Sequence, residues 1–177
     1  MAASMLSACT GLGSLKQGQW IHEYIEKSGI ELDSKLATAI IDMYCKCGYL
    51  EKAFEVFNGL THKGISSWNS MIGGLALHGK GMDAVELLKE MERQAEAPDY
   101  ITFVNVLSAC SHSGLVEEGH YYFRYMTEVH SIVPRSEHFG CMVDLLGRSG
   151  LLDEARKLVN DMQIGRASCR ERVCQYV

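Results

Sequence analysis

The sequence predicts an all-α fold, an α-solenoid of about five stacked antiparallel helix-turn-helix units. Similar short strings recur along the 177 residues, and each contains one glycine in the same place. The glycines are spaced 35, 31, 35 and 36 residues apart: Gly13, Gly48, Gly79, Gly114 and Gly150. Five residues after each of them stands a small residue: Gly18, Ala53, Ala84, Gly119 and Ala155. Two markers in step indicate a structural repeat.

Each unit is expected to contain two helices. In the clearest unit the first helix covers about Ser66–Leu77, and Gly79 interrupts the chain after it. The second helix carries one apolar stripe at i, i+3, i+4 and i+7, made of Ala84, Leu87, Leu88 and Met91. Small residues such as Ala84 are expected to let the two helices of a unit approach closely. One pair buries too little apolar surface alone, so neighbouring pairs must stack.

Composition and charge exclude several classes of protein. A chain that is 47% hydrophobic and 22% charged is typical of a soluble folded protein. The longest uncharged runs, such as Ile65–Leu77, are too short to span a bilayer, so no membrane partner is expected. The net charge of −5 disfavours a generic phosphate-binding surface, and DNA binding is not expected. The seven scattered cysteines are interpreted as reduced thiols inside a cell.

The sequence contains no catalytic signature that we could find. None of the seven histidines is followed two residues later by glutamate, and C-x-x-C is absent, so the motif of zinc-dependent deaminases is missing. Cys45 and Cys47 form an isolated C-x-C without a second pair of ligands. We therefore predict that the chain is not an enzyme and has no cofactor, metal site or catalytic residue.

The amino-acid sequences of the repeats resemble the pentatricopeptide repeats (PPRs) of plant organellar proteins. They resemble the PLS subclass, in which standard, long and short motifs alternate. Four stretches carry the resemblance: Ala39–Phe57 (short), Ser66–Glu92 (standard), Ile101–Phe123 (long) and His138–Val159 (short). Tetratricopeptide repeats are the alternative, because Ala53-x3-Phe57 matches their A-x3-F signature. Their fixed length of about 34 residues does not match the varied spacing here. The resemblance implies a right-handed superhelix.

The glycine markers place the expected units. The array spans 1–163 and consists of a partial long unit 1–33, a short unit 34–64, a standard unit 65–99, a long unit 100–135 and a truncated short unit 136–163. Residues 164–177 differ in composition and are interpreted as a non-native, adapter-like tail that is disordered. The chain is thus expected to be a fragment that exposes apolar side chains such as Leu6 and Leu158 at its ends.

The resemblance implies that each unit contacts one RNA base through the fifth residue of its first helix and the last residue of the unit. The expected pairs are Asn69/Asp99, Thr38/Gly64, Val104/Arg135 and the partial pair Ala3/Asp33, and Gly140 begins a fifth pair. Asn69 with Asp99 matches the family's pattern for uridine first and cytidine second. The alternative is that Asn69 only caps a helix, as asparagine near a helix start commonly does.

The second residue of the first helix wedges between bases in the family that the sequence resembles. Ile101 suits this role, whereas Ser66, Lys35 and Glu137 do not. Lys35 could instead contact a phosphate.

The resemblance implies sequence-specific binding of single-stranded RNA, which in the full-length protein guides C-to-U editing or processing of organellar transcripts. The expected partners are such a transcript and editing-complex proteins, in a mitochondrion or plastid. One alternative is a protein-binding scaffold of the tetratricopeptide type, which the acidic net charge favours. Another is a truncated chain with no activity of its own.

Overall fold

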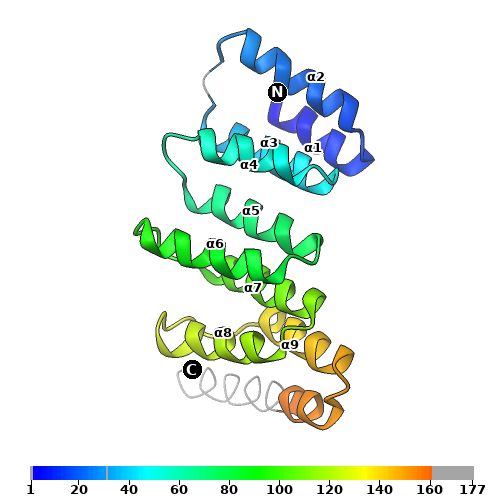
Figure 1. Ribbon diagram of the computed structural model, residues 1–177, viewed down its shortest axis with the longest axis vertical. Helices are drawn as coiled ribbons and strands as arrows, with labels where there is room; N and C mark the ends of the chain where they lie inside the picture. Colours follow the sequence, from blue (N-terminus) through cyan, green and yellow to red (C-terminus); the bar gives the residue numbers. More distant parts are fainter. Residues whose placement is uncertain (1, 31, 161–177) are drawn as a thin grey trace, which may run out of the picture.

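The computed structural model describes residues 2–30 and 32–160, and the predicted tail at 164–177 lies outside this range. The described residues are helical without any strand, as predicted, and Figure 1 shows the helices in chain order. The helices are α1 (Ala2–Leu12), α2 (Leu15–Lys27), α3 (Ser34–Lys46), α4 (Leu50–Gly59), α5 (Ile65–Leu77), α6 (Gly81–Arg93), α7 (Tyr100–Ser113), α8 (Val116–Glu128) and α9 (Ser136–Arg148). Residues 152–160 are helical as well. No helix in the described ranges is long and apolar enough to cross a bilayer.

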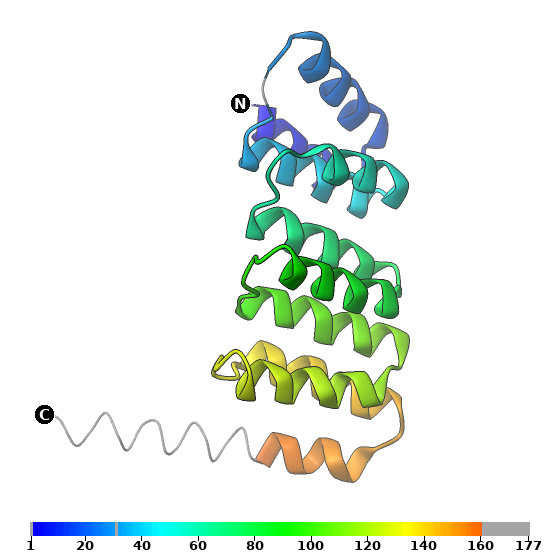
Figure 2. The ribbon, with the colours of Figure 1, turned by 60° about the vertical axis from the view of Figure 1, so that its left-hand side comes forward.

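The helices form two layers that run the length of the molecule. The odd-numbered helices pack on one another in sequence, α1 on α3, α3 on α5, α5 on α7 and α7 on α9. Each of the helices α2, α4, α6 and α8 packs on the odd-numbered helix before it and on the one after it (Figure 2). Both contacts are needed to bury the apolar stripe of an even-numbered helix. This arrangement confirms the predicted α-solenoid.

The repeated glycines end the odd-numbered helices. A left-handed residue is a common way to close a helix, and it costs an L-residue other than glycine about 1–2 kcal/mol. All five marker glycines have a positive φ: Gly13 (61°), Gly48 (86°), Gly79 (63°), Gly114 (68°) and Gly150 (78°). The glycine spacing that revealed the repeat therefore marks the positions at which the backbone is left-handed after each odd-numbered helix.

Two residues of the second marker, Gly18 and Gly119, lie against the helix of the following unit, a contact that the expectation of close approach within one unit did not include. A Cβ on Gly18 of α2 would lie 2.5 Å from the Sδ atom of Met43 on α3. A Cβ on Gly119 of α8 would overlap Leu145 on α9. The small residue thus makes room for a large core side chain of the next unit.

The expectation that Leu6 is exposed is wrong. Leu6 is 0% exposed and belongs to the continuous hydrophobic core, because α1 packs against both α2 and α3. Leu158 is partly buried and also packs against the core. Of the two apolar side chains that were expected to be exposed at the ends, Leu6 is therefore fully covered and Leu158 partly covered.

Lowering the pH is expected to destabilise the fold through His138. This residue is 0% exposed; its Nδ1 accepts the backbone N–H of Arg135 (2.9 Å), and its Nε2 lies 2.9 Å from the carbonyl oxygen of Tyr100. Burial lowers the pKa of His138 below its usual value, so the folded state favours the neutral ring. The unfolded chain then binds the proton more readily, and stability that is complete above pH of about 6.5 is lost as the pH falls below it.

Urea unfolding of the parent and of His138→Gln between about pH 7 and 5.5 measures this effect, because His138→Gln should reduce the pH dependence. His62→Gln, at an exposed position before α5, is the matched control and should leave the dependence as in the parent. Equal pH dependence in parent and His138→Gln would contradict the role of His138.

Candidate nucleic-acid interface

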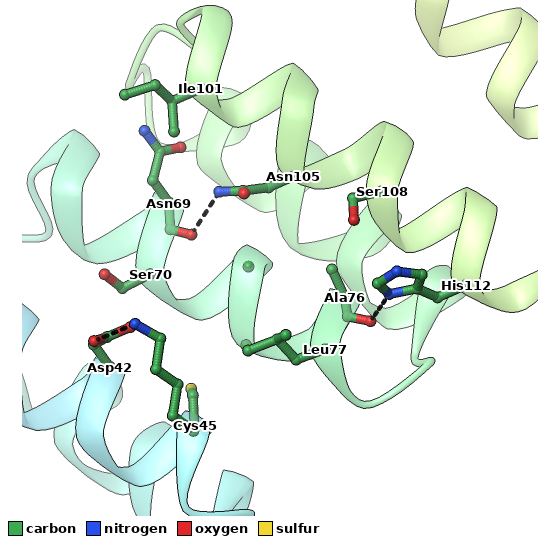
Figure 3. A pocket seen from close by; sticks show the side chains of 13 residues that line it. Asp42, Cys45, Asn69, Ser70, Ala76, Leu77, Ile101, Asn105, Ser108 and His112 are labelled. Carbon is green, nitrogen blue, oxygen red and sulfur yellow. Dashed lines mark hydrogen bonds and ion pairs between the residues drawn. The ribbon is translucent and has the colours of Figure 1, made fainter. Parts of the chain in front are cut away.

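A groove crosses the layer of odd-numbered helices where α3, α5 and α7 lie side by side (Figure 3). Its volume is about 380 Å³, which falls within the usual range of ligand pockets. Its lining combines polar side chains with two adjacent glycines of α5, Gly73 and Gly74. The groove is lined by Asp42, Cys45, Lys46, Asn69, Ser70, Gly73, Gly74, Ala76, Leu77, Ile101, Asn105, Ser108 and His112.

The predicted base-reading positions occupy equivalent places in this layer. Thr38, Asn69, Val104 and Gly140 are each the fifth residue of an odd-numbered helix, counted from the observed helix starts. The predicted partners of Thr38, Asn69 and Val104 are the N-cap residues of the next odd-numbered helix, namely Gly64, Asp99 and Arg135 at α5, α7 and α9. Asp33, the predicted partner of Ala3, is likewise the N-cap of α3. Each complete pair therefore joins the fifth residue of one odd-numbered helix to the N-cap of the next odd-numbered helix.

Asn69 and Asp99 are bonded to each other. The Asn69 Nδ2 donates to the Asp99 Oδ1 across 3.1 Å, and the Asn105 Nδ2 donates to the Asn69 backbone oxygen across 2.9 Å. Asn69 is 9% exposed and lines the groove, where its amide points toward Ile101 (Figure 3). The pair is thus held in place before any ligand arrives.

Helix capping at this place is done by Asp99 and not by Asn69. Gly64 is the N-cap of α5, and Asn69 lies a full turn into that helix. Asp99 caps α7 and accepts the backbone N–H of Thr102 (2.9 Å), while the Thr102 hydroxyl accepts the backbone N–H of Asp99 (3.0 Å). Asn69 is therefore free of a capping role.

The other predicted pairs offer fewer polar side-chain groups to a base. The Thr38 hydroxyl donates to the Ser34 backbone oxygen (2.6 Å), and Gly64 has no side chain to place beside it. Val104 and Gly140 present no polar side-chain atom, and Arg135 stacks 3.8 Å from the centre of the Tyr100 ring. In the partial pair Ala3/Asp33, the Asp33 carboxylate caps α3 by accepting the Leu36 N–H at 2.7 Å.

The predicted wedge positions are all on the surface. Ile101, Ser66 and Lys35 are exposed second residues of α7, α5 and α3. Ile101 is 41% exposed and lines the groove, whereas Ser66 and Lys35 do not line it. The structure thus brings Ile101, but not the other two, into the same groove as Asn69.

Sequence reasoning missed Thr102 and Asn105, which both contact Asn69 from α7. A signal for Thr102 was present, since Asp99 is a favoured N-cap residue and Thr102 stands three positions after it, at the spacing of a reciprocal helix cap. Asn105 carried no such signal, because its partner is a backbone oxygen on another helix.

Two buried cysteines, Cys45 and Cys110, are poorly suited to thiol chemistry. Burial raises the pKa of Cys45 and of Cys110 to about 12, so both stay protonated near neutral pH. Cys45 and Cys47 are not part of any group of side chains, within residues 2–30 and 32–160, that could hold a metal ion.

Family models identify the repeats. A model described as "PPR repeat" matches residues 37–65, 101–129 and 137–164, and one described as "PPR repeat family" matches residues 63–112. The chain belongs to the pentatricopeptide repeat family. The matched residues are PPR repeats.

Three PPR relatives come from Arabidopsis thaliana. Protein At4g18840 is 50% identical over 165 residues, which are 93% of this chain and 30% of the relative. The proteins At1g08070, named chloroplastic, and At2g03880, named mitochondrial, are each 48% identical and match 91% and 90% of this chain, or 22% and 25% of their own lengths. The chain thus spans less than a third of these relatives.

The fold is also that of a solved PPR protein. A crystal structure of PPR10, a protein from maize, in complex with an 18-nt psaJ RNA element superimposes with a TM-score of 0.82 over 92% of this chain. The match covers 24% of the PPR10 chain at 24% sequence identity, so it establishes the fold and not the binding sites.

Proposed function

We propose that this chain binds single-stranded RNA along the layer of odd-numbered helices, and that Asn69 with Asp99 selects one base, uridine before cytidine. The observation that carries the proposal is the bonded Asn69/Asp99 pair in a groove that Ile101 also lines. An amide beside a fixed acceptor, next to an exposed aliphatic side chain, suits a base that is both hydrogen-bonded and stacked.

Asn69 has hydrogen-bonding capacity left for a base. Its Nδ2 has two N–H groups and donates one of them to Asp99, and its Oδ1 accepts one bond from Thr102 (2.7 Å). One donor and one acceptor remain. Uracil offers a donor between two acceptors on its Watson–Crick edge, which matches this remainder.

Weak binding follows from the other pairs and from charge. Only Asn69/Asp99 combines an amide with an acid. The units of Val104 and Gly140 would act as spacers between base-reading units. The one lysine that lines the groove, Lys46, is paired with Asp42 at 2.9 Å, and the chain carries a net charge of −5. We therefore expect few released counterions and a shallow salt dependence.

In the longer protein, this segment would guide editing or processing of an organellar transcript, together with editing-complex proteins. The chloroplastic and mitochondrial names of two relatives support such a location. We also propose that residues 1–163 consist of a long, a short, a standard, a long and a short unit, in that order.

Fluorescence anisotropy with the whole chain and a uridine-rich single-stranded RNA tests the proposal. We expect tighter binding to this RNA than to an adenosine-rich strand or to double-stranded DNA of equal length. Equal binding to all three, or to none, would refute it. Saturable binding of a peptide in place of RNA would favour the scaffold alternative.

Gly64→Asp is expected to create a second base-reading pair. Gly64 has an ordinary φ of −76°, and the nearest atom to an added Cβ would be Ser34 Oγ at 3.7 Å, so an acid fits there. The new carboxylate would cap α5 and stabilise the fold by about 0.3–1 kcal/mol. Beside Thr38 it would complete the combination of threonine and acid, which the family's pattern associates with guanosine.

Binding to a pool of random RNA sequences, followed by sequencing, should show a new preference for guanosine at one position in Gly64→Asp. Gly64→Ala adds the Cβ without the acid and should leave base preference as in the parent. A stabilised Gly64→Asp variant without a new guanosine preference would mean that the Thr38 position does not read a base.

A further inference from the structure

Thr102 lies between the two members of the proposed base-reading pair. It is the third residue of α7 and is 0% exposed, with Asp99 one turn before it and Asn69 opposite it on α5. Its backbone N–H and its hydroxyl oxygen form the helix cap with Asp99. One further polar atom of Thr102 takes no part in that cap, namely the hydroxyl proton.

The hydroxyl proton has two acceptors within reach, Asn69 Oδ1 at 2.7 Å and Asp99 Oδ1 at 3.0 Å. Asp99 Oδ1 already accepts the Thr102 N–H and the Asn69 Nδ2. The Asn69 oxygen is nearer and has no other donor among the contacts of the described residues. The proton therefore belongs to the bond with Asn69, which joins α7 to α5.

Two contacts consequently fix the orientation of the Asn69 amide. Its nitrogen faces a carboxylate that only accepts, and its oxygen faces a hydroxyl whose proton points to it. Turning the amide by 180° would place its oxygen against a carboxylate oxygen that cannot donate, and the Thr102 hydroxyl would have to turn its proton from Asn69 to Asp99. The donor and acceptor that remain for a base thus have fixed places.

We infer that the Thr102 hydroxyl is a positioning group that sets the preference of Asn69 for uridine over cytidine. The inference rests on the proposed function. Uracil carries a donor at N3 and an acceptor at position 4, whereas cytosine carries an acceptor at N3 and a donor at position 4. The two bases therefore require opposite orientations of the same amide. A fixed amide separates them, and an amide that turns freely does not.

Thr102→Val tests the inference, because it keeps the shape of the side chain and removes the hydroxyl. One neutral hydrogen bond changes an equilibrium by about two- to tenfold, so the uridine-to-cytidine ratio at one RNA position should fall by that factor. Thr102→Ser restores the hydroxyl and should restore the ratio. Thr127→Val, on α8, removes a hydroxyl that bonds only to the backbone of its own helix and should leave the ratio as in the parent.

The experiment uses the whole chain and a random single-stranded RNA pool, and far-UV circular dichroism confirms that each variant is folded. A purely structural Thr102 would lower thermal stability and total RNA binding without changing the ratio, and this result would overturn the inference while leaving the proposed function intact. A parent chain that shows no uridine preference at any position would overturn both.

Discussion

Trp68→Ala is expected to destabilise the protein by about 3–5 kcal/mol, the usual cost of removing a large buried aromatic side chain. Trp68 lies on α5 and is 1% exposed. Its ring packs edge-on against Phe57 of α4, with the ring centres 4.8 Å apart, and its Nε1 donates to the Lys63 backbone oxygen at 3.1 Å. The substitution removes all of these contacts at the junction between two units. Urea unfolding followed by far-UV circular dichroism measures the change.

Trp20→Ala is the matched control. Trp20 on α2 is 62% exposed and stacks on Tyr24 at 5.9 Å, so its removal should change stability by no more than about 0.5 kcal/mol. Trp68→Phe keeps most of the packing and loses the N–H donor, and an intermediate value is expected. Equal stability of Trp68→Ala and Trp20→Ala would show that the junction does not depend on this side chain.

The architecture was predictable from the sequence because the repeated glycines stand where the backbone must be left-handed at the end of a helix. The glycines that revealed the repeat are the residues with positive φ after the odd-numbered helices, and their spacing places those helices along the chain. Of the apolar stripe predicted on the second helix of one unit, Ala84, Leu88 and Met91 are buried on α6, and Leu87 is partly buried against the core. Periodicity and turn residues act locally, so a single sequence is enough to find them.

Contacts between units were harder to predict, because they depend on which side chains meet across two helices. Gly18 and Gly119 lie against large side chains of the next unit, and Leu6 is covered by helices on both sides. Thr102 lies 33 residues after Asn69 in the chain and bonds to it through its hydroxyl. The sequence indicates only the helix-capping role of that hydroxyl. Local patterns predict the helices, and the packing of α5 on α7 forms the candidate site.

Asn69→Thr is expected to change the preferred base at one RNA position from uridine to guanosine. A threonine at the fifth position of an odd-numbered helix already exists in this chain, and the Thr38 hydroxyl donates its proton to the backbone oxygen four residues earlier. The same bond at position 69 would leave only acceptor lone pairs facing the groove, beside the Asp99 carboxylate. Guanine carries two donors on its Watson–Crick edge and meets two acceptors there, whereas uracil would lose a donor for one of its oxygens.

The total affinity of Asn69→Thr for its best RNA should stay within about tenfold of the parent, because one base contact is replaced by another of about 1–3 kcal/mol. Selection from a random single-stranded RNA pool measures the preference, and thermal unfolding measures stability. Asn58→Thr makes the same change at an exposed position of α4 and should leave base preference as in the parent. If Asn69 only links α5 to α7, Asn69→Thr will lower stability and leave the preference for all four bases unchanged, which would reject base reading by this pair.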